Sequence, residues 1–200
     1  MKKTKKGKFD IFEEYKKSLD YIKKSKNFIF AIIGIFFLFV LVGFFIPPPE
    51  IIYNEIIKFM QQLIETTKGM SASELIGFII SNNTKSTFFG VLLGTFFGIF
   101  PIISAIANGY MLGFVSAASV HSEGIFSLWK LLPHGIFELP AVFISLGLGL
   151  KLGTFIFQRD KIKNLKEYTI NSFKVFFLVI IPLLVIAGII EGTLMVLLNN

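Results

Sequence analysis

The stretch LWKLLPHGIFELPAVFISLGLGLKLG, from Leu128 to Gly153, decides how this chain is interpreted. It is long and apolar enough for a helix that crosses a bilayer, which needs about 20 residues. Its first half nevertheless carries His134 and Glu138. An ionisable side chain at membrane depth is costly and therefore usually faces a protein interior or a polar cavity. The pair is the first candidate for a functional or structural site.

The composition of the rest of the chain predicts a membrane protein. Hydrophobic residue types make up 54% of the 200 residues and charged types only 16%, and other apolar runs reach membrane-spanning length. We therefore expect an all-α, polytopic membrane bundle over 28–200. Its five predicted spans are 28–46, 88–107, 110–128, 133–157 and 175–198. The chain has no cysteine, which excludes disulfides and thiolate metal sites.

The first 27 residues are predicted to form a basic amphipathic helix in the cytoplasm, outside the membrane domain. This segment holds ten of the twenty Lys and Arg residues, and one helical face carries Phe12, Tyr15, Leu19 and Ile22. A nucleic-acid arm would be equally basic, but a position directly before a span favours membrane electrostatics. The predicted partners of the lysines are lipid headgroups, not nucleic acid.

Residues 50–85 are expected to form an amphipathic helical pair on the outer surface of the membrane. The first helix has one apolar stripe and ends near Gly69, while Ser71 and Glu74 have the spacing of a capping box for the second. The stripe consists of Ile52, Ile56, Phe59, Met60 and Leu63.

Basic residues fix the predicted orientation. A second basic segment, the predicted loop 158–174, contains Arg159 and four lysines. The positive-inside rule places this loop and the N-terminus in the cytoplasm, and five spans then leave the C-terminus outside the cell membrane. The outer half would hold the ionisable residues of interest, which are His121, Glu123, His134, Glu138 and Glu191.

Small residues predict how two of the spans pack. One quarter of the helix circumference holds His134, Glu138, Ala141, Ser145 and Gly149. The second span has its own row of small residues, Gly90, Gly94 and Gly98, and such rows let membrane helices approach closely. We expect the two rows to pack together and to place the His–Glu pair inside the bundle. The glycine row also makes a homodimer a hypothesis.

Three roles remain open for the polar cluster. A buried His134–Glu138 hydrogen bond that fixes helix register is the favoured interpretation. The second is a site for zinc or another divalent metal, with ligands drawn from His134, Glu138, Glu191, His121 and Glu123. The third is a proton or ion relay in a transporter. The chain has no phosphate-binding glycine loop, nucleophile elbow or H-E-x-x-H motif, so enzyme chemistry rests on this cluster alone.

The stretch from Leu131 to Gly153 resembles the signature of the stage II sporulation protein M family of integral membrane proteins. Its P-H-G-x-x-E-x-P core is supported by Asn82-Asn83, by Asn108-Gly109 with Gly113, and by the acidic Glu191 near the end of the chain. The resemblance implies a membrane platform, since the family's namesake helps to gather peptidoglycan-degrading enzymes at the septal membrane.

The favoured function is therefore a non-catalytic scaffold or assembly factor for cell-envelope partners. The alternative is an intramembrane metal-dependent hydrolase, or a small-solute or ion transporter, that uses His134, Glu138 and Glu191.

Overall fold

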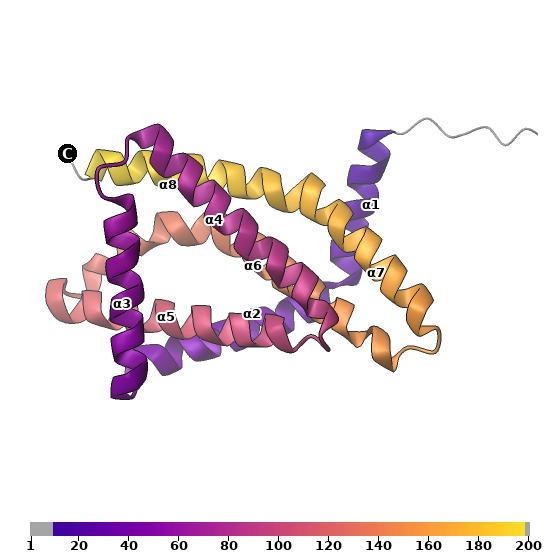
Figure 1. Cartoon of the computed structure of the whole chain (residues 1–200), viewed down its shortest axis with the longest axis horizontal. Helices are drawn as coiled ribbons and strands as arrows, with labels where there is room; N and C mark the ends of the chain where they lie inside the picture. The colour runs from indigo at the N-terminus through magenta and orange to yellow at the C-terminus, as the bar shows by residue number, and fades with distance from the viewer. Residues whose placement is uncertain (1–9, 199–200) are drawn as a thin grey trace, which may run out of the picture.

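The computed structural model describes residues 10–198, and over this range it contains helices and turns but no strand (Figure 1). The side chains of 130–137 and 196–198 lie outside the description. The all-α prediction is confirmed. The α-helices are α1 (Ile11–Lys24), α2 (Lys26–Phe45), α3 (Glu50–Thr67), α4 (Ala72–Leu92), α5 (Ile99–Glu123), α6 (Leu132–Gly153), α7 (Lys161–Val175) and α8 (Ile181–Leu198). The 3₁₀ segments are η1 (Leu93–Thr95), η2 (Ile125–Leu131) and η3 (Thr154–Phe157), and η4 (Phe176–Ile180) is a π-helical turn.

Most helices run broadly along the long axis of the molecule, while α1 and α3 lie across it at opposite ends (Figure 1). The turns that follow α4 and α6 lie at the end that carries α1, which we name the α1 end. The end of α5 and the described end of α8 lie at the other end, which we name the α3 end.

Four segments of the described chain are long and apolar enough to cross a membrane. They are Lys26–Phe45, Ile99–Glu123, Glu138–Phe157 and Lys161–Met195. Helix α4 is comparably long but has the polar run SNNTKS (81–86) at its centre. The expected spans 28–46 and 133–157 correspond closely to α2 and to α6 with η3.

The chain reverses at a different place from the one predicted between the second and third spans. The expected helix 88–107 does not form as one piece, because the chain turns between α4 and α5. Phe97 and Gly98 both have positive φ, +57° and +71°, and this left-handed backbone starts the new direction. Pro101 then lies in the first turn of α5, where a missing N–H is tolerated.

Asn108 and Gly109, which have the composition of a turn, lie inside α5, and the predicted boundary between 107 and 110 is therefore wrong. Gly109 is needed for packing: an added Cβ would overlap the backbone of Phe36 in α2. Gly113 faces the carbonyl oxygen of Val40 in the same way. Two helices whose backbones approach this closely require glycine at the contact, so these glycines reflect helix packing and not a turn.

The region predicted as the loop 158–174 is also helical. Helix α7 begins at Lys161 and continues through the π turn η4 into α8, so one continuous helical segment replaces the expected loop and last span. A basic, polar composition favoured a loop in the sequence, but α7 is held by contacts with α1 and α6.

The expected helical pair over 50–85 forms only in part as predicted. Helix α3 ends at Thr67, Gly69 has φ of +80°, and Ser71 and Glu74 form the capping box of α4. Helix α4 then continues past residue 85 and packs between α6 and α8. Of this described pair, α3 alone lies at the surface.

Candidate functional site

The ionisable residues predicted for one site lie on three helices near the α3 end. Glu191 on α8 is buried, with 7% of its surface exposed, and Glu138 on α6 is partly buried. His121 and Glu123 are exposed in the last turn of α5. The backbone of His134 belongs to α6, but its side chain lies outside the described residues.

The described part of the chain does not assemble a metal site from these residues. Among the described side chains, no three His, Asp or Glu residues gather closely enough to hold a metal ion. The set Glu138, Glu191, His121 and Glu123 therefore supplies no such site without His134. The metal prediction, zinc or otherwise, depends on a side chain that the structure does not describe.

The predicted small-residue rows meet between α4 and α6. An added Cβ on Gly94 would overlap the backbone of Gly149, and one on Gly90 would lie 2.9 Å from Leu146 Cδ2. Gly98 faces Leu150 at the end of the same row. Ser145 lies fully buried between the helices and donates a 2.5 Å hydrogen bond to the carbonyl oxygen of Thr87.

This contact has two consequences. Ala141 and Ser145 are fully buried on the face of α6 that Glu138 shares, so the carboxylate lies one turn before Ala141 and about three turns before the close contact of Gly149 with Gly94. Gly90, Gly94 and Gly98 of the predicted row are occupied by contacts within the chain, so a homodimer would need another surface. Homodimerisation stays a prediction.

A second polar cluster, at the α1 end, was not foreseen from the sequence. Lys151 of α6 donates a 3.0 Å hydrogen bond from Nζ to Ser25 Oγ, in the junction between α1 and α2. The same ammonium lies 3.9 Å from the ring centroid of Tyr21 and 5.2 Å from that of Tyr168. Such contacts stabilise a partly desolvated cation. Lys151 thus joins α6 to α1 and α7.

Helix α1 is fastened to α7 by its polar face. Glu14 forms a short ion pair with Lys174 of α7. Within α1, the hydroxyl of Ser18 donates to the Glu14 carbonyl oxygen at 2.9 Å. The hydrogen bond from Lys174 is the main reason that the pKa of Glu14 lies below its usual value of 4.5. Burial raises the pKa of Tyr21, so its phenol stays neutral.

The predicted apolar stripe of α1 is divided in the structure. Phe12 and Tyr15 are exposed, as is the neighbouring Ile11, whereas Leu19 and Ile22 are partly buried against the core. The helix therefore presents an apolar edge beside its exposed lysines, as an interfacial helix does.

Helix α3 is held far more loosely. In the described structure it lies largely apart from the other helices, and Ile56 is its one buried residue. Tyr53 makes an edge contact with Phe114 of α5, with 5.9 Å between ring centroids. Most other large apolar side chains of α3 are exposed, including Phe59 at 54% and Ile64 at 62%, whereas Ile57 and Met60 are partly buried.

The fold defines an all-α protein with four helices long enough to cross a bilayer, joined by tight glycine contacts and flanked by two crosswise helices. The chain belongs to the stage II sporulation protein M family, whose model matches residues 28–194. It is a membrane protein of that family.

Two relatives come from Methanocaldococcus jannaschii. Uncharacterized protein MJ0793 is 36% identical over 118 residues, which cover 56% of this chain and 66% of that protein. Uncharacterized protein MJ0706 is 29% identical over 184 residues, which cover 85% of this chain and 78% of that protein. No solved structure matches this chain.

Proposed function

We propose that this protein is a non-catalytic membrane scaffold that recruits cell-envelope partners through α3. The observation that carries the proposal is the contrast within α3 between one buried residue, Ile56, and a series of exposed apolar side chains. An exposed apolar patch on a helix that its own fold does not cover is typical of an interaction site.

The proposed orientation puts the α1 end in the cytoplasm and α3 with the C-terminus outside. It is supported by the position of the basic segments, because the start of α7, where Arg159, Lys161 and Lys163 occur in the sequence, and the basic helix α1 are at the same end of the molecule. Lys and Arg next to membrane helices favour the cytoplasmic side. Five passages along the long axis, by α2, α4, α5, α6 and α7–α8, are compatible with this assignment.

The chemistry of α3 indicates what its partner resembles. The apolar face of α3 combines aromatic and aliphatic side chains, while the opposite, polar face carries Asn54, Lys58 and Glu65. A helix of this kind fits an apolar groove, or a second amphipathic helix, on an envelope protein at the membrane surface.

The test is site-specific photo-crosslinking from α3 in cells that contain the natural partners. A photoreactive amino acid at Phe59 is expected to join this chain to a discrete cell-envelope protein. The same group at Glu65, on the opposite face, is the control and is expected to give no such product. Products with lipid alone at Phe59, or the same products at both positions, would contradict recruitment by this face.

A second candidate function is an intramembrane metal-dependent hydrolase or an ion or small-solute transporter. The observation that favours it is Glu191, a buried carboxyl group on the very apolar helix α8. Metal analysis of the detergent-purified protein decides between hydrolase and scaffold, with His134→Ala, Glu138→Ala and Glu191→Ala beside the wild type. One divalent ion per chain, lost in the variants, would favour the hydrolase. A folded, metal-free wild type would argue against it.

A further inference from the structure

The junction between α1 and α2 borders an open groove that neither helix fills. The groove has a volume of about 490 Å³ and is lined by Ile22, Lys23, Lys26, Ile29, Phe30 and Ile144. It lies at the α1 end, where the crosswise α1 meets the long apolar helix α2 (Figure 1).

The lining is divided by chemistry. Lys23 and Lys26 provide two ammonium groups at one side, and the remaining four residues provide an apolar wall. Phe30 is 65% exposed on the part of α2 that continues into the predicted span. A molecule that satisfies both parts has an anionic head and a hydrocarbon tail.

Carboxylates near the two lysines compete only weakly with a ligand for the lysine charge. Lys23 lies 4.0 Å from Asp20 Oδ1, and both side chains are mostly exposed, so this pair adds little stability. The first turn of α2 has no acidic residue. Positive charge from the lysines therefore remains available to a ligand.

The charge that favours an anion comes from the two lysines. Ser25, between α1 and α2, has its hydroxyl engaged within the fold, where it donates to the carbonyl oxygen of Tyr21 and accepts from Lys151. Because α2 begins directly after the last turn of α1, the opposite ends of the two helix dipoles offset each other.

We propose that this groove binds one anionic phospholipid from the leaflet at the α1 end. The phosphate lies between Lys23 and Lys26, and an acyl chain lies along Ile29, Phe30 and Ile144. The chemistry selects a lipid over a free phosphate, because a free anion would leave the apolar wall uncovered. The site does not depend on the scaffold proposal, since no contact with α3 contributes to it.

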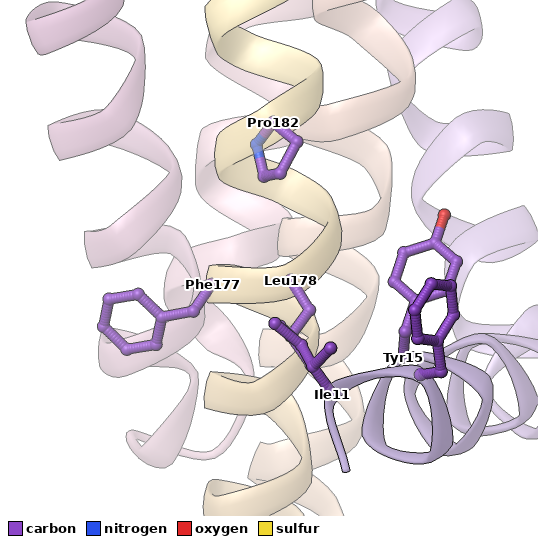
Figure 2. A pocket seen from close by; sticks show the side chains of 6 residues that line it. Ile11, Tyr15, Phe177, Leu178 and Pro182 are labelled. Atoms are coloured by element: carbon purple, nitrogen blue, oxygen red, sulfur yellow. The ribbon is translucent and has the colours of Figure 1, made fainter.

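A second groove, at the other end of α1, provides an internal contrast. Figure 2 shows Ile11 of α1 close to Leu178 of η4, with Tyr15 to one side and Pro182 further along the same continuous helical segment. This groove, about 320 Å³ in volume, has no charged lining residue. It offers no means of selecting a headgroup, and we assign it no specific ligand.

The test is native mass spectrometry of the full-length protein in detergent, titrated with phosphatidylglycerol or phosphatidylcholine. The wild type is expected to bind one phosphatidylglycerol with preference over phosphatidylcholine. The variant Lys23→Gln/Lys26→Gln is expected to lose roughly thirtyfold in affinity for phosphatidylglycerol, about fivefold for each lysine. Lys16→Gln/Lys163→Gln, which removes the same charge from exposed positions of α1 and α7, is the matched control and is expected to retain binding.

Two further measurements distinguish a lipid site from a general attraction of anions to the two lysines. Inorganic phosphate at the lipid concentration is expected to leave lipid binding unchanged, and Lys23→Arg/Lys26→Arg is expected to retain it. Equal binding of the two lipids, an equal loss in the control variant, or displacement by phosphate would overturn the proposal. None of these outcomes bears on crosslinking from α3, so the two proposals fail independently.

Discussion

Helices α1 and α3 are both amphipathic, and both lie across the bundle, yet the chain treats them differently (Figure 1). Helix α1 is tied down by the Glu14–Lys174 ion pair and by the contact of Tyr21 and Ser25 with Lys151. Helix α3 has only Ile56 buried and the ring contact of Tyr53. Polar contacts therefore fix α1 in the fold, while α3 keeps its apolar surface available.

The difference separates two uses of an amphipathic helix. In α1 the side that carries Ser18 and Tyr21 packs on the protein, while Phe12 and Tyr15 are exposed beside the lysines, an arrangement suited to contact with lipid. In α3 the connections to α2 and α4 hold the helix near the bundle without burying its apolar face. Three substitutions and one change of pH test this contrast, in order of expected effect.

The largest effect is expected from Gly94→Ala, which should disrupt the packing of α6 against α4 and η1 near the α1 end. The added methyl group would overlap the backbone of Gly149, two residues before Lys151, and push α6 away from α4. We expect a loss of about 3 kcal/mol in stability, measured by thermal unfolding in detergent. Gly77→Ala is the control, because open space surrounds Gly77, and it should be neutral or stabilising by up to about 1 kcal/mol. Equal losses in both variants would refute close packing at Gly94.

Lys151→Met should release α1 without disturbing α3. It removes the hydrogen bond to Ser25 and the cation over Tyr21, which together hold α1 by roughly 1–2 kcal/mol. The chain has no native cysteine, so spin labels at Lys16→Cys and Lys166→Cys report directly on the α1–α7 distance. We expect a broadened distance distribution in the variant, and an unchanged distribution would show that Lys151 does not fasten α1.

Acidification should loosen α1 more gently. The pKa of Glu14 is lowered in the folded chain, so its contribution is present above the usual value of 4.5 and is lost as the pH falls through the lowered pKa. The same pair of spin labels should show α1 unchanged near neutral pH and more mobile in strongly acidic solution. Glu14→Gln should remove this pH dependence, whereas Glu13→Gln, which affects only the pair with Lys17, should preserve it.

The smallest effect is expected from Phe59→Ser on α3. Because the ring is more than half exposed, its loss should change stability by less than about 0.5 kcal/mol in the thermal assay. Ile56→Ser, one turn away on the buried side, should be clearly destabilising. A large loss at Phe59 would mean that α3 is part of the fold and would weaken its assignment as a free surface.

Periodicity and capping chemistry allowed much of the fold to be predicted. The apolar runs located α2 and α6, and the Ser71–Glu74 spacing located the start of α4. The reversal at Phe97 and Gly98 escaped prediction because its residues are apolar and carry none of the polar turn residues that mark a loop in water. Asn108-Gly109 has that composition but serves close packing inside α5.

The candidate sites were predictable to different degrees. Small-residue spacing was sufficient to predict a contact between α4 and α6, because that pattern is local to each helix, and Gly94 and Gly149 lie against each other in the structure. The role of Lys151 was not predictable, since a lysine near a helix end is ordinarily taken to extend to the membrane surface. Its partners Ser25 and Tyr21 are more than a hundred residues away along the chain, and only the fold brings them together.

The π turn η4 gives the last part of the chain a mechanical property. Since α7, η4 and α8 form one continuous helical segment over 161–198, this segment is a rod roughly 57 Å long at 1.5 Å per residue, close to twice the thickness of a hydrocarbon core. One part of the rod carries Lys174, the partner of α1, and the other carries the buried Glu191. A movement of α1 that tilted this segment would therefore also displace Glu191, which lies about 26 Å beyond Lys174 along the same helical axis.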